Sequence, residues 1–454
     1  MTDQRFADVA EVVTDLERAS VYEHGWQSWS PTGLYPALAT SPRPQRPRWQ
    51  TNSFRPELPA PATGFQGEGL LAVLPADGPV RLWVTPDPTA AVPSIRARAE
   101  AGRIVVSADG PVEELSYDGP LDEALGAWAE TVAARIGLPP VRTLEPAWCS
   151  WYAYWAEVIE KDVLENLTAI DRLGLDVGTV QLDDGYAAEH GDWLELNNRF
   201  SSLRGLADRI SATGRLPGIW TAPFQVGSRS RIAREHPDWL VGGTLAGPGW
   251  DQQIHVLDVT HPHAAEHLTG VFRTLAADGY GYFKLDFLYA GAVPGRRHED
   301  IDPIAAYRRG LELVRTGAGP DAVLLGCGAP IFPSLGLVDA MRISPDIDPE
   351  FEPVDGDISQ PSMRSALTIG RARAWQHGRF WVNDPDCMLA RPEVADRELW
   401  AAHIEAYGAL AASSDPLDAL DERGLELTRR LLRPSSPAPV RWDPEQGTIV
   451  PATP

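Results

Sequence analysis

The segment Gly281-Tyr282-Phe283-Lys284-Leu285-Asp286-Phe287 (residues 281–287) is an apolar and aromatic run that carries one lysine and one aspartate. Its composition is typical of a short buried strand. Alternation along a strand predicts that Lys284 and Asp286 share one face, opposite the three apolar side chains at 283, 285 and 287. Buried charges are costly unless they pair or take part in chemistry, and the chain has only two lysines. The segment therefore indicates either a structural ion pair or a strand that carries functional side chains.

Strand-like runs alternate with longer helical stretches on both sides of this segment, from residue 144 to residue 412. The expected strands are Ala147–Tyr152, Thr179–Asp183, Gly218–Thr221, Ile254–Val259, Tyr282–Phe287, Val323–Cys327, Ala340–Ser344 and Phe380–Asp384. The expected helices are Asp162–Leu173, Ser201–Ala212, Pro262–Ala277, Pro303–Thr316 and Pro361–Gln376. Eight strands over roughly 265 residues, near the ~250 typical of such folds, predict an α/β protein with a (β/α)8 TIM barrel. A doubly wound sheet is the alternative.

The chain divides into three predicted parts. Residues 1–143 are β-rich, with strands at Leu70–Leu74, Val80–Thr85 and Arg103–Ala108, and are expected to form a β-sandwich-like domain that contributes to the mouth of the barrel. A helix over Asp122–Ile136 ends this part before Gly137 and two prolines. Residues 144–412 form the predicted barrel. Residues 413–454 form a short C-terminal segment, with a helix near Asp415–Leu432 and a proline-rich tail with little strand content.

Composition limits the range of functions. Hydrophobic residues make up 43% and charged residues 23% of the 454 residues, which is ordinary for a soluble globular protein. The formal net charge of −23 argues against nucleic acid or an anionic membrane as a partner. The cysteines Cys149, Cys327 and Cys387 fit neither a disulfide framework nor a zinc spacing. Residues 1–18 lack a signal-peptide pattern, and no run reaches the ~18 apolar residues of a membrane span. We therefore expect a reduced, cytoplasmic protein.

Polar and aromatic residues gather at the predicted strand ends, where barrel enzymes hold their active sites. These residues occur in WCSWY (148–152), DDGY (183–186), WTAP (220–223), KLD (284–286), CG (327–328), RISPD (342–346) and NDPD (383–386). Acids at several ends, together with a lysine, an arginine and several tryptophans, predict a polar cup with aromatic walls. Carboxylates accept hydroxyl protons, cations donate, and indoles stack on C–H faces, so the cup is suited to a sugar.

With these motifs the chain resembles glycoside hydrolase family 36, the α-galactosidases of the melibiase clan. The resemblance runs from about Pro146 to Arg391 and includes WCSWYAYW (148–155), QLDDGY (181–186), GIWTAPF (218–224), YFKLDFLYAGAVPG (282–295), GCGAP (326–330), MRISPD (341–346) and NDPDC (383–387). HGWQSWSP (24–31) is similar to the segment that the family's N-terminal domain sends toward the active site. The resemblance implies a retaining α-galactosidase that acts on small oligosaccharides or other galactosides and needs no cofactor or metal.

The resemblance also implies residue roles. Asp286 matches the nucleophile and Asp346 the general acid/base of a double displacement, and Lys284 is expected to keep Asp286 ionised. Asp183 and Asp184 match the pair that binds the 4- and 6-hydroxyls of galactose. Further expected substrate-binding residues are Lys284, Arg342 and Cys327, with Trp220 and Trp151 as apolar walls and Trp26 or Trp29 closing the mouth.

Other interpretations stay open at this point. Cys327 is equally well explained as a small buried hydrophobe, and Trp26 and Trp29 as core residues. The histidines His261, His263 and His267 have no acidic partner fixed by spacing, so we expect no metal site. The alternative activities are galactosyl transfer of the raffinose- or stachyose-synthase type, or α-N-acetylgalactosaminidase activity. A non-catalytic sugar-binding barrel is a third alternative, and a homo-oligomer is a possible assembly.

Overall fold

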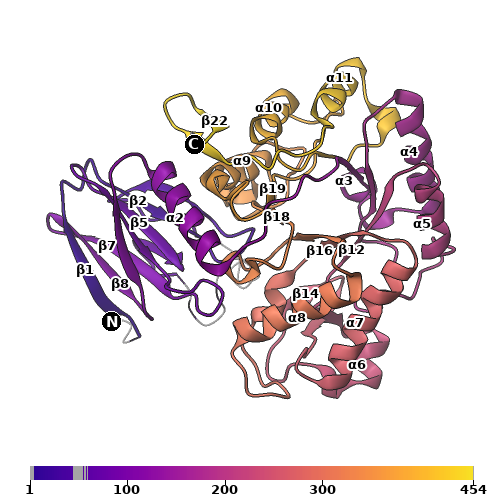
Figure 1. Cartoon of the computed structure of the whole chain (residues 1–454), viewed down its shortest axis with the longest axis horizontal. Helices are drawn as coiled ribbons and strands as arrows, with labels where there is room; N and C mark the ends of the chain where they lie inside the picture. The colour runs from indigo at the N-terminus through magenta and orange to yellow at the C-terminus, as the bar shows by residue number, and fades with distance from the viewer. Residues whose placement is uncertain (1–4, 44–54, 56–57, 59, 453–454) are drawn as a thin grey trace.

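The computed structural model describes residues 5–43, 55, 58 and 60–452 (Figure 1). In the part of the chain before residue 120, the described strands form two antiparallel sheets. One sheet contains β1 (Ala7–Val13), β8 (Arg103–Ala108), β7 (Ser94–Glu100) and β4 (Phe65–Glu68) in that order. The other contains β3 (Gly33–Pro36), β2 (Ser20–Glu23), β5 (Leu70–Leu74), β6 (Val80–Val84) and β9 (Glu113–Tyr117). Side chains from both sheets, among them Val21, Trp83 and Val106, share one hydrophobic core. The three strands predicted for this region are therefore confirmed.

Helix α2 (Leu121–Ile136) links this lobe to the rest of the molecule. It ends at Gly137, whose left-handed φ of 68° lets its backbone N–H reach the last carbonyl groups of the helix. The Trp128 ring contacts the rings of Phe332 and Trp375 from the C-terminal two thirds of the chain. The packing of α2 therefore holds the N-terminal sheets against the rest of the protein.

Within the described residues, an eight-stranded parallel sheet forms the centre of the remaining chain. Its order is β19 (Val382–Asp384), β18 (Ala340–Arg342), β17 (Val323–Gly326), β16 (Tyr282–Leu285), β12 (Leu216–Thr221), β11 (Thr179–Leu182), β10 (Ala147–Cys149) and β20 (Ala412–Ser413). The sheet curls, and its two ends are joined by backbone hydrogen bonds. The N–H of Leu410 donates to Asn383 (3.1 Å), and that of Met388 donates to Ala412 (2.6 Å). The parallel architecture predicted from the alternation is thus confirmed.

The five helices predicted for the barrel are present as α4 (Glu160–Leu173), α5 (Leu203–Ser211), α7 (Pro262–Ala277), α8 (Pro303–Ala318) and α9 (Met363–Ala372). The described residues also form helices that were not predicted, α3 (Trp151–Tyr154), α6 (Arg231–Glu235) and α10 (Arg397–Tyr407). Pro262 and Pro303 occupy the first turn of their helices, as expected of a residue with a fixed φ and no N–H. No helix in the described ranges is both long and apolar enough to cross a membrane.

One strand prediction was wrong, and one strand of the sheet was missed. The run Ile254–Val259 is not part of the parallel sheet, because β15 (Gln252–Val256) pairs antiparallel with β13 (Gln225–Gly227) and β14 (Gly247–Gly249), and β12 pairs directly with β16. The eighth strand is instead β20, which spans the predicted boundary at 412/413. A short apolar run has the same sequence pattern in a hairpin strand and in a barrel strand, so the pattern could not assign Ile254–Val259 to either. A strand of two residues, such as β20, is too short to show any periodicity.

The C-terminal segment also differs from expectation. Its helix is α11 (Glu422–Leu431), which begins only after a short turn of 3₁₀ helix at Leu417–Ala419. The tail forms a hairpin of β21 (Val440–Asp443) and β22 (Thr448–Pro451), where little strand content was expected. Pro451 lies on an edge, where its missing N–H removes no ladder hydrogen bond that the sheet needs.

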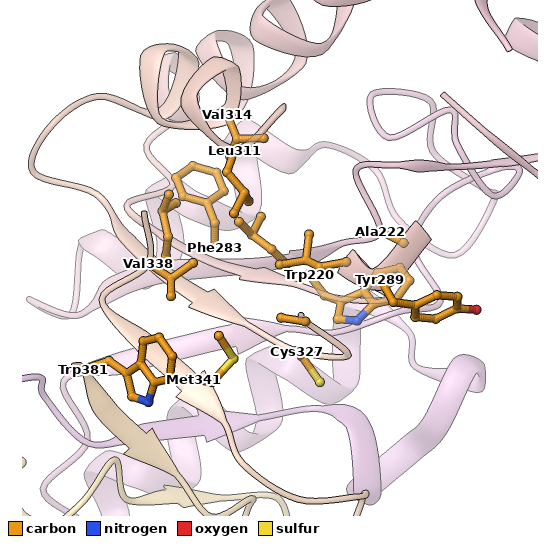
Figure 2. Close-up of a cluster of buried hydrophobic side chains, with 14 of the residues drawn as sticks. Trp220, Ala222, Phe283, Tyr289, Leu311, Val314, Cys327, Val338, Met341 and Trp381 are labelled. Atoms are coloured by element: carbon orange, nitrogen blue, oxygen red, sulfur yellow. The ribbon is translucent and has the colours of Figure 1, made fainter. Parts of the chain in front are cut away.

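The two faces of the segment 281–287 point to different parts of the molecule. In Figure 2, Phe283 of β16 points toward Leu311 and Val314 of α8, on the outer side of the sheet. Phe287 departs from the predicted alternation, because β16 ends at Leu285 and Phe287 has a left-handed φ of 50°. Its ring therefore turns to the same cavity that Asp286 faces.

Candidate active site

A cavity of about 210 Å³ lies at the carboxyl ends of the parallel strands. Its lining contains four carboxylates and a set of aromatic rings. The lining residues are Trp29, Trp151, Ala156, Asp183, Asp184, Trp220, Trp250, Asp286, Phe287, Pro345, Asp346, Ser359 and Pro361. Convergent acids inside an otherwise apolar hollow are typical of a site that binds a small polar molecule in a fixed orientation.

Asp286 is held in a fixed orientation at the end of β16. Its Oδ2 accepts a hydrogen bond from the indole Nε1 of Trp220 (3.0 Å), and its Oδ1 accepts one from the backbone N–H of Phe287 (2.7 Å). Its own N–H donates to the carbonyl of Thr221 (2.8 Å). The side chain is 8% exposed, so the carboxylate faces the cavity with little freedom to rotate.

Lys284 has a different direct partner from the expected one. Its Nζ lies 2.9 Å from Asp183 Oδ2, and both side chains are almost fully buried. Although burial acts to lower it, the pKa of Lys284 is raised well above its ordinary value by the negative charges of Asp183 and Asp286. The register explains the pairing, because Lys284 lies opposite Trp220 on β12 and extends past it toward β11. Lys284 therefore fixes Asp183 directly and acts on Asp286 only through its charge.

Asp183 and Asp184 occupy different surroundings although they are neighbours. Asp183 Oδ2 accepts hydrogen bonds from Gln181 Nε2 (2.6 Å) and from Lys284, so that oxygen is fully engaged within the protein. Asp184 Oδ2 accepts one from Trp250 Nε1 (2.8 Å). Burial raises the pKa of Asp184 to about 6, and the Trp250 hydrogen bond opposes that shift. Both carboxyl groups line the cavity and are positioned to accept hydrogen bonds from a ligand.

Asp346 belongs to a cluster of three carboxylates around Arg342. The guanidinium contacts Asp346 Oδ1 (3.0 Å), Asp384 Oδ2 (3.0 Å) and Asp386 Oδ1 (2.8 Å) while its own side chain is 2% exposed. About a third of the Asp346 side chain (34%) stays accessible through the cavity. Burial raises the pKa of Asp346 to about 7, and the charge of Asp386 adds to this, whereas Arg342 opposes it. Asp346 can therefore hold a proton near neutral pH.

Trp29 reaches the cavity from the N-terminal lobe. Its loop is pinned to the loop after β17, because the Ser28 N–H donates to Ala329 (3.1 Å) and the Ile331 N–H donates to Trp26 (3.0 Å). The Trp29 ring lies edge-on to Phe287 at 5.1 Å. Gly328, at a left-handed φ of 53°, lies under the indole, where an added Cβ would come within 2.8 Å of the ring. Only glycine satisfies both conditions.

Arg373 ties this loop to the end of β18. The side chain is fully buried, and burial lowers its pKa to about 10. Its Nη1 donates to the carbonyls of Ser28 (2.5 Å) and Ile343 (2.9 Å), and its Nη2 donates to Gln27 (2.9 Å). One guanidinium thus connects the loop that carries Trp29 with the strand that leads to Asp346.

Replacing Arg373 by methionine is expected to lower the free energy of unfolding by about 3 kcal/mol, because several buried carbonyls lose their donor. Trp29 should also loosen, so we expect kcat/KM to fall by about 10-fold in the folded variant. Denaturant unfolding and steady-state kinetics measure the two effects. Arg371→Met is the matched control, because that guanidinium lies over the Trp442 ring (4.9 Å), remote from the loop. Equal effects of the two substitutions would contradict the assigned role.

The structure brings most of the predicted site residues to one cavity, but not all. Asp286, Asp346, Asp183, Asp184, Trp220, Trp151 and Trp29 line it. Lys284, Arg342 and Cys327 are buried and are not among the described residues that line the cavity. Lys284 and Arg342 instead contact its carboxylates. Burial raises the pKa of the Cys327 thiol well above its usual range, and the charge of Asp286 adds to this. Trp26 lines a separate cavity of about 90 Å³ with Leu58 and Ile304, so it does not close the mouth.

Sequence reasoning missed Trp250, Phe287 and Ser359 in the lining, and the roles of Asp384 and Asp386. Trp250 follows Gly247-Pro248-Gly249, a turn signal that could have marked an aromatic residue at a hairpin tip. His261 lies near His263 and His298, yet no group of three or more His, Cys, Asp or Glu in the described residues is arranged to hold a metal ion.

The chain is similar to known proteins over both sequence and structure. The family model "Melibiase" matches residues 150–300. The α-galactosidase AgaA of Geobacillus stearothermophilus is 30% identical over 181 residues, which are 37% of this chain and 24% of AgaA. The match thus spans about a quarter of the length of that relative.

Solved structures extend the similarity to nearly the whole chain. The α-galactosidase TtGalA of Thermus thermophilus, in complex with p-nitrophenyl α-D-galactopyranoside, has a TM-score of 0.78 and 27% identity, covering 96% of this chain and 93% of TtGalA. Its complex with stachyose has a TM-score of 0.79 and 29% identity, covering 94% and 93%. The AgaA structure shares the fold at a TM-score of 0.63 and 15% identity, covering 93% of this chain and 61% of AgaA. By these matches the chain is similar to the α-galactosidases TtGalA and AgaA, and it shares their fold over nearly its whole length.

Proposed function

We propose that the protein is a retaining α-galactosidase that removes terminal α-linked galactose from oligosaccharides or other galactosides. One observation carries the proposal: Asp286 and Asp346 line a single aromatic-walled cavity in contrasting environments. Asp286 is oriented by hydrogen bonds from Trp220 and its own backbone turn, whereas the pKa of Asp346 is raised to about 7 by burial. Two carboxyl groups that differ in this way fit the two roles that a retaining glycosidase requires.

In the first step, Asp286 attacks C1 of the galactosyl unit while Asp346 donates its proton to the leaving oxygen. The C1–oxygen bond breaks, and a galactosyl ester of Asp286 forms. In the second step, Asp346 removes a proton from water, which attacks C1 and releases Asp286. Such a mechanism works best with the two carboxyl groups ~5–5.5 Å apart. Arg342 positions Asp346 throughout, because it joins that carboxylate to Asp384 and Asp386.

The remaining lining residues hold the sugar. Asp183 and Asp184 accept hydrogen bonds from its hydroxyls, and Trp29, Trp151 and Trp220 pack against its C–H faces. Lys284 holds Asp183 in place through their ion pair, so its contribution to binding passes through that carboxylate. The complexes of TtGalA with an aryl α-galactoside and with stachyose support small galactosides as the substrate class.

We also propose how the chain divides into domains. The backbone hydrogen bonds between the edges of the parallel sheet support a closed (β/α)8 barrel over residues 144–412. The core shared by the two N-terminal sheets supports a β-sandwich domain over residues 1–143, with 413–454 as a C-terminal extension. The cytoplasmic location and the homo-oligomer stay predictions of the sequence.

A panel of aryl glycosides tests the proposed function. Turnover is expected for the α-galactoside and, more weakly, for the β-L-arabinopyranoside, which lacks C6. The α-glucoside is expected to be at least about 100-fold poorer in kcat/KM, because a site built around hydroxyl groups rejects a misplaced one. The α-N-acetylgalactosaminide is expected to be poorer by a similar factor of about 100, because its 2-acetamido group is bulkier than the hydroxyl that it replaces. Activity confined to the α-glucoside would contradict the assignment. Excess acceptor sugar with the α-galactoside should still yield mainly free galactose; mainly transfer product would favour a galactosyltransferase.

A further inference from the structure

A second cavity adjoins the active site. It has a volume of about 210 Å³ and shares Ala156, Asp184 and Trp250 with the catalytic cavity. The described residues that line it do not include Asp286 or Asp346. Its own lining is polar, with Glu157, Glu189, His190, Arg199, Arg229 and Gln252 among the contributors. The two hollows therefore meet at the Asp184–Trp250 pair.

The indole of Trp250 forms a partition between the two cavities. One face stacks on the His190 ring, which lines the second cavity, at 3.8 Å and 28°. The Phe287 ring, which lines the catalytic cavity, lies at 5.3 Å and 70° to the indole. The indole Nε1 donates to Asp184 Oδ2 at 2.8 Å, and this hydrogen bond fixes the Trp250 ring in place between His190 and Phe287.

The hairpin tip that carries Trp250 is held in an unfavourable backbone conformation. Trp250 and Asp251 both have left-handed φ angles, 48° and 54°, which non-glycine residues seldom adopt. Arg229 donates from Nη2 to the carbonyl of Trp250 (3.1 Å) and from Nη1 to that of Asp251 (3.2 Å). Strain that is maintained by dedicated contacts is typical of residues aimed at a functional site.

The partition lies away from the leaving group. In the parallel sheet, β11, which leads to Asp184, is four positions from β18, which leads to Asp346, and β16 with Asp286 lies midway. A leaving group protonated by Asp346 therefore departs from the opposite side of the sugar to Asp184. The second cavity extends from the part of the site that holds the non-reducing end.

We propose that Trp250 is a specificity-determining wall that restricts the enzyme to an unsubstituted terminal galactose, and that the second cavity is a latent pocket for a substituent on the hydroxyl that Asp184 receives. This inference rests on the proposed function. A small ether or ester group, or a further sugar, on that hydroxyl would meet the indole in the native protein. With the indole removed, the substituent would extend into the polar second cavity.

The test compares an aryl α-galactoside with its four mono-O-methyl derivatives at positions 2, 3, 4 and 6. The native enzyme is expected to reject a methyl group at one position next to Asp184 by about 100-fold in kcat/KM. Trp250→Ala and Trp250→Leu should reduce that rejection by about 10-fold or more at this position alone. Trp250→Phe should keep the rejection, because it retains the wall, and should lose activity on the unmethylated substrate, because it removes the hydrogen bond to Asp184.

Trp239→Ala is the matched control, because Trp239 also stacks on a histidine, His236 at 3.9 Å, but is absent from the described lining of both cavities. Its methyl-position profile should equal that of the native enzyme. The proposed role of Trp250 would be contradicted if the alanine and leucine variants cleave the unmethylated substrate but keep the native ratio of kcat/KM between methylated and unmethylated substrate at all four positions. If the native enzyme fails to cleave the unmethylated α-galactoside, the proposed function itself is wrong, and this inference falls with it.

Discussion

Replacing Asp286 by alanine or asparagine is expected to lower kcat on an aryl α-galactoside by about 10⁴-fold or more, because no other group can form the covalent intermediate. KM should change far less, since the hydrogen bonds to the sugar come from other lining residues. Steady-state kinetics with a long incubation time measure both values. Wild-type turnover in either variant would eliminate Asp286 as the nucleophile.

Asp339→Asn is the control for the asparagine variant. Asp339 is a carboxylate that precedes β18, at the end of the strand opposite the cavity, and it pairs with Arg315 (2.7 Å) and Arg142 (3.2 Å). Its loss should alter stability but leave kcat within about twofold. A large loss of kcat in both asparagine variants would indicate a general structural effect and not a missing nucleophile.

Replacing Asp346 by alanine is expected to lower kcat/KM on a galactoside with a poor leaving group, such as an alkyl galactoside, by about 10²–10⁴-fold. The loss should be much smaller for a dinitrophenyl galactoside, whose leaving oxygen needs no proton. Asp348→Ala, two residues along the same loop, should show no such dependence on the leaving group. A uniform loss across all leaving groups would contradict the acid role.

The same variant should change the pH profile. The pKa of Asp346 is raised by burial to about 7, and an acid catalyst must be protonated. The kcat/KM of the native enzyme on the alkyl galactoside is therefore expected to be highest below that value and to fall as the pH rises through it. In Asp346→Ala this alkaline decline should disappear. Persistence of the decline in the variant would assign it to another group.

Much of the site could be predicted because it depends on strand ends. Asp286 follows an apolar strand, and Asp346 follows another at an RxxxD spacing, so a parallel sheet brings both to one edge. The helix boundaries at Pro262 and Pro303 were equally clear, since proline fixes the first turn. Each of these features depends on residues that are close together in the sequence, so the sequence pattern alone predicts it.

The rest depends on contacts between distant segments. The partner of Lys284 is Asp183, 101 residues away, and no pattern within the β16 strand distinguishes that pairing from one with Asp286. Trp250 reaches the cavity only because an inserted hairpin takes the place where a barrel strand was expected. Arg373 receives its role from carbonyls of a loop about 345 positions earlier in the chain. Tertiary packing decides such roles, and a single sequence does not encode them in any short motif.

The most direct test of the double displacement is the product that Asp286→Ala forms from an activated aryl α-galactoside in the presence of azide. Azide is small enough to occupy the space left by the carboxylate, and it attacks C1 from the same side as Asp286 does. The mechanism predicts restored release of the aryl group and a β-galactosyl azide, identified by NMR. An α-galactosyl azide, or no response to azide in a folded variant, would contradict the assignment of Asp286 as the nucleophile.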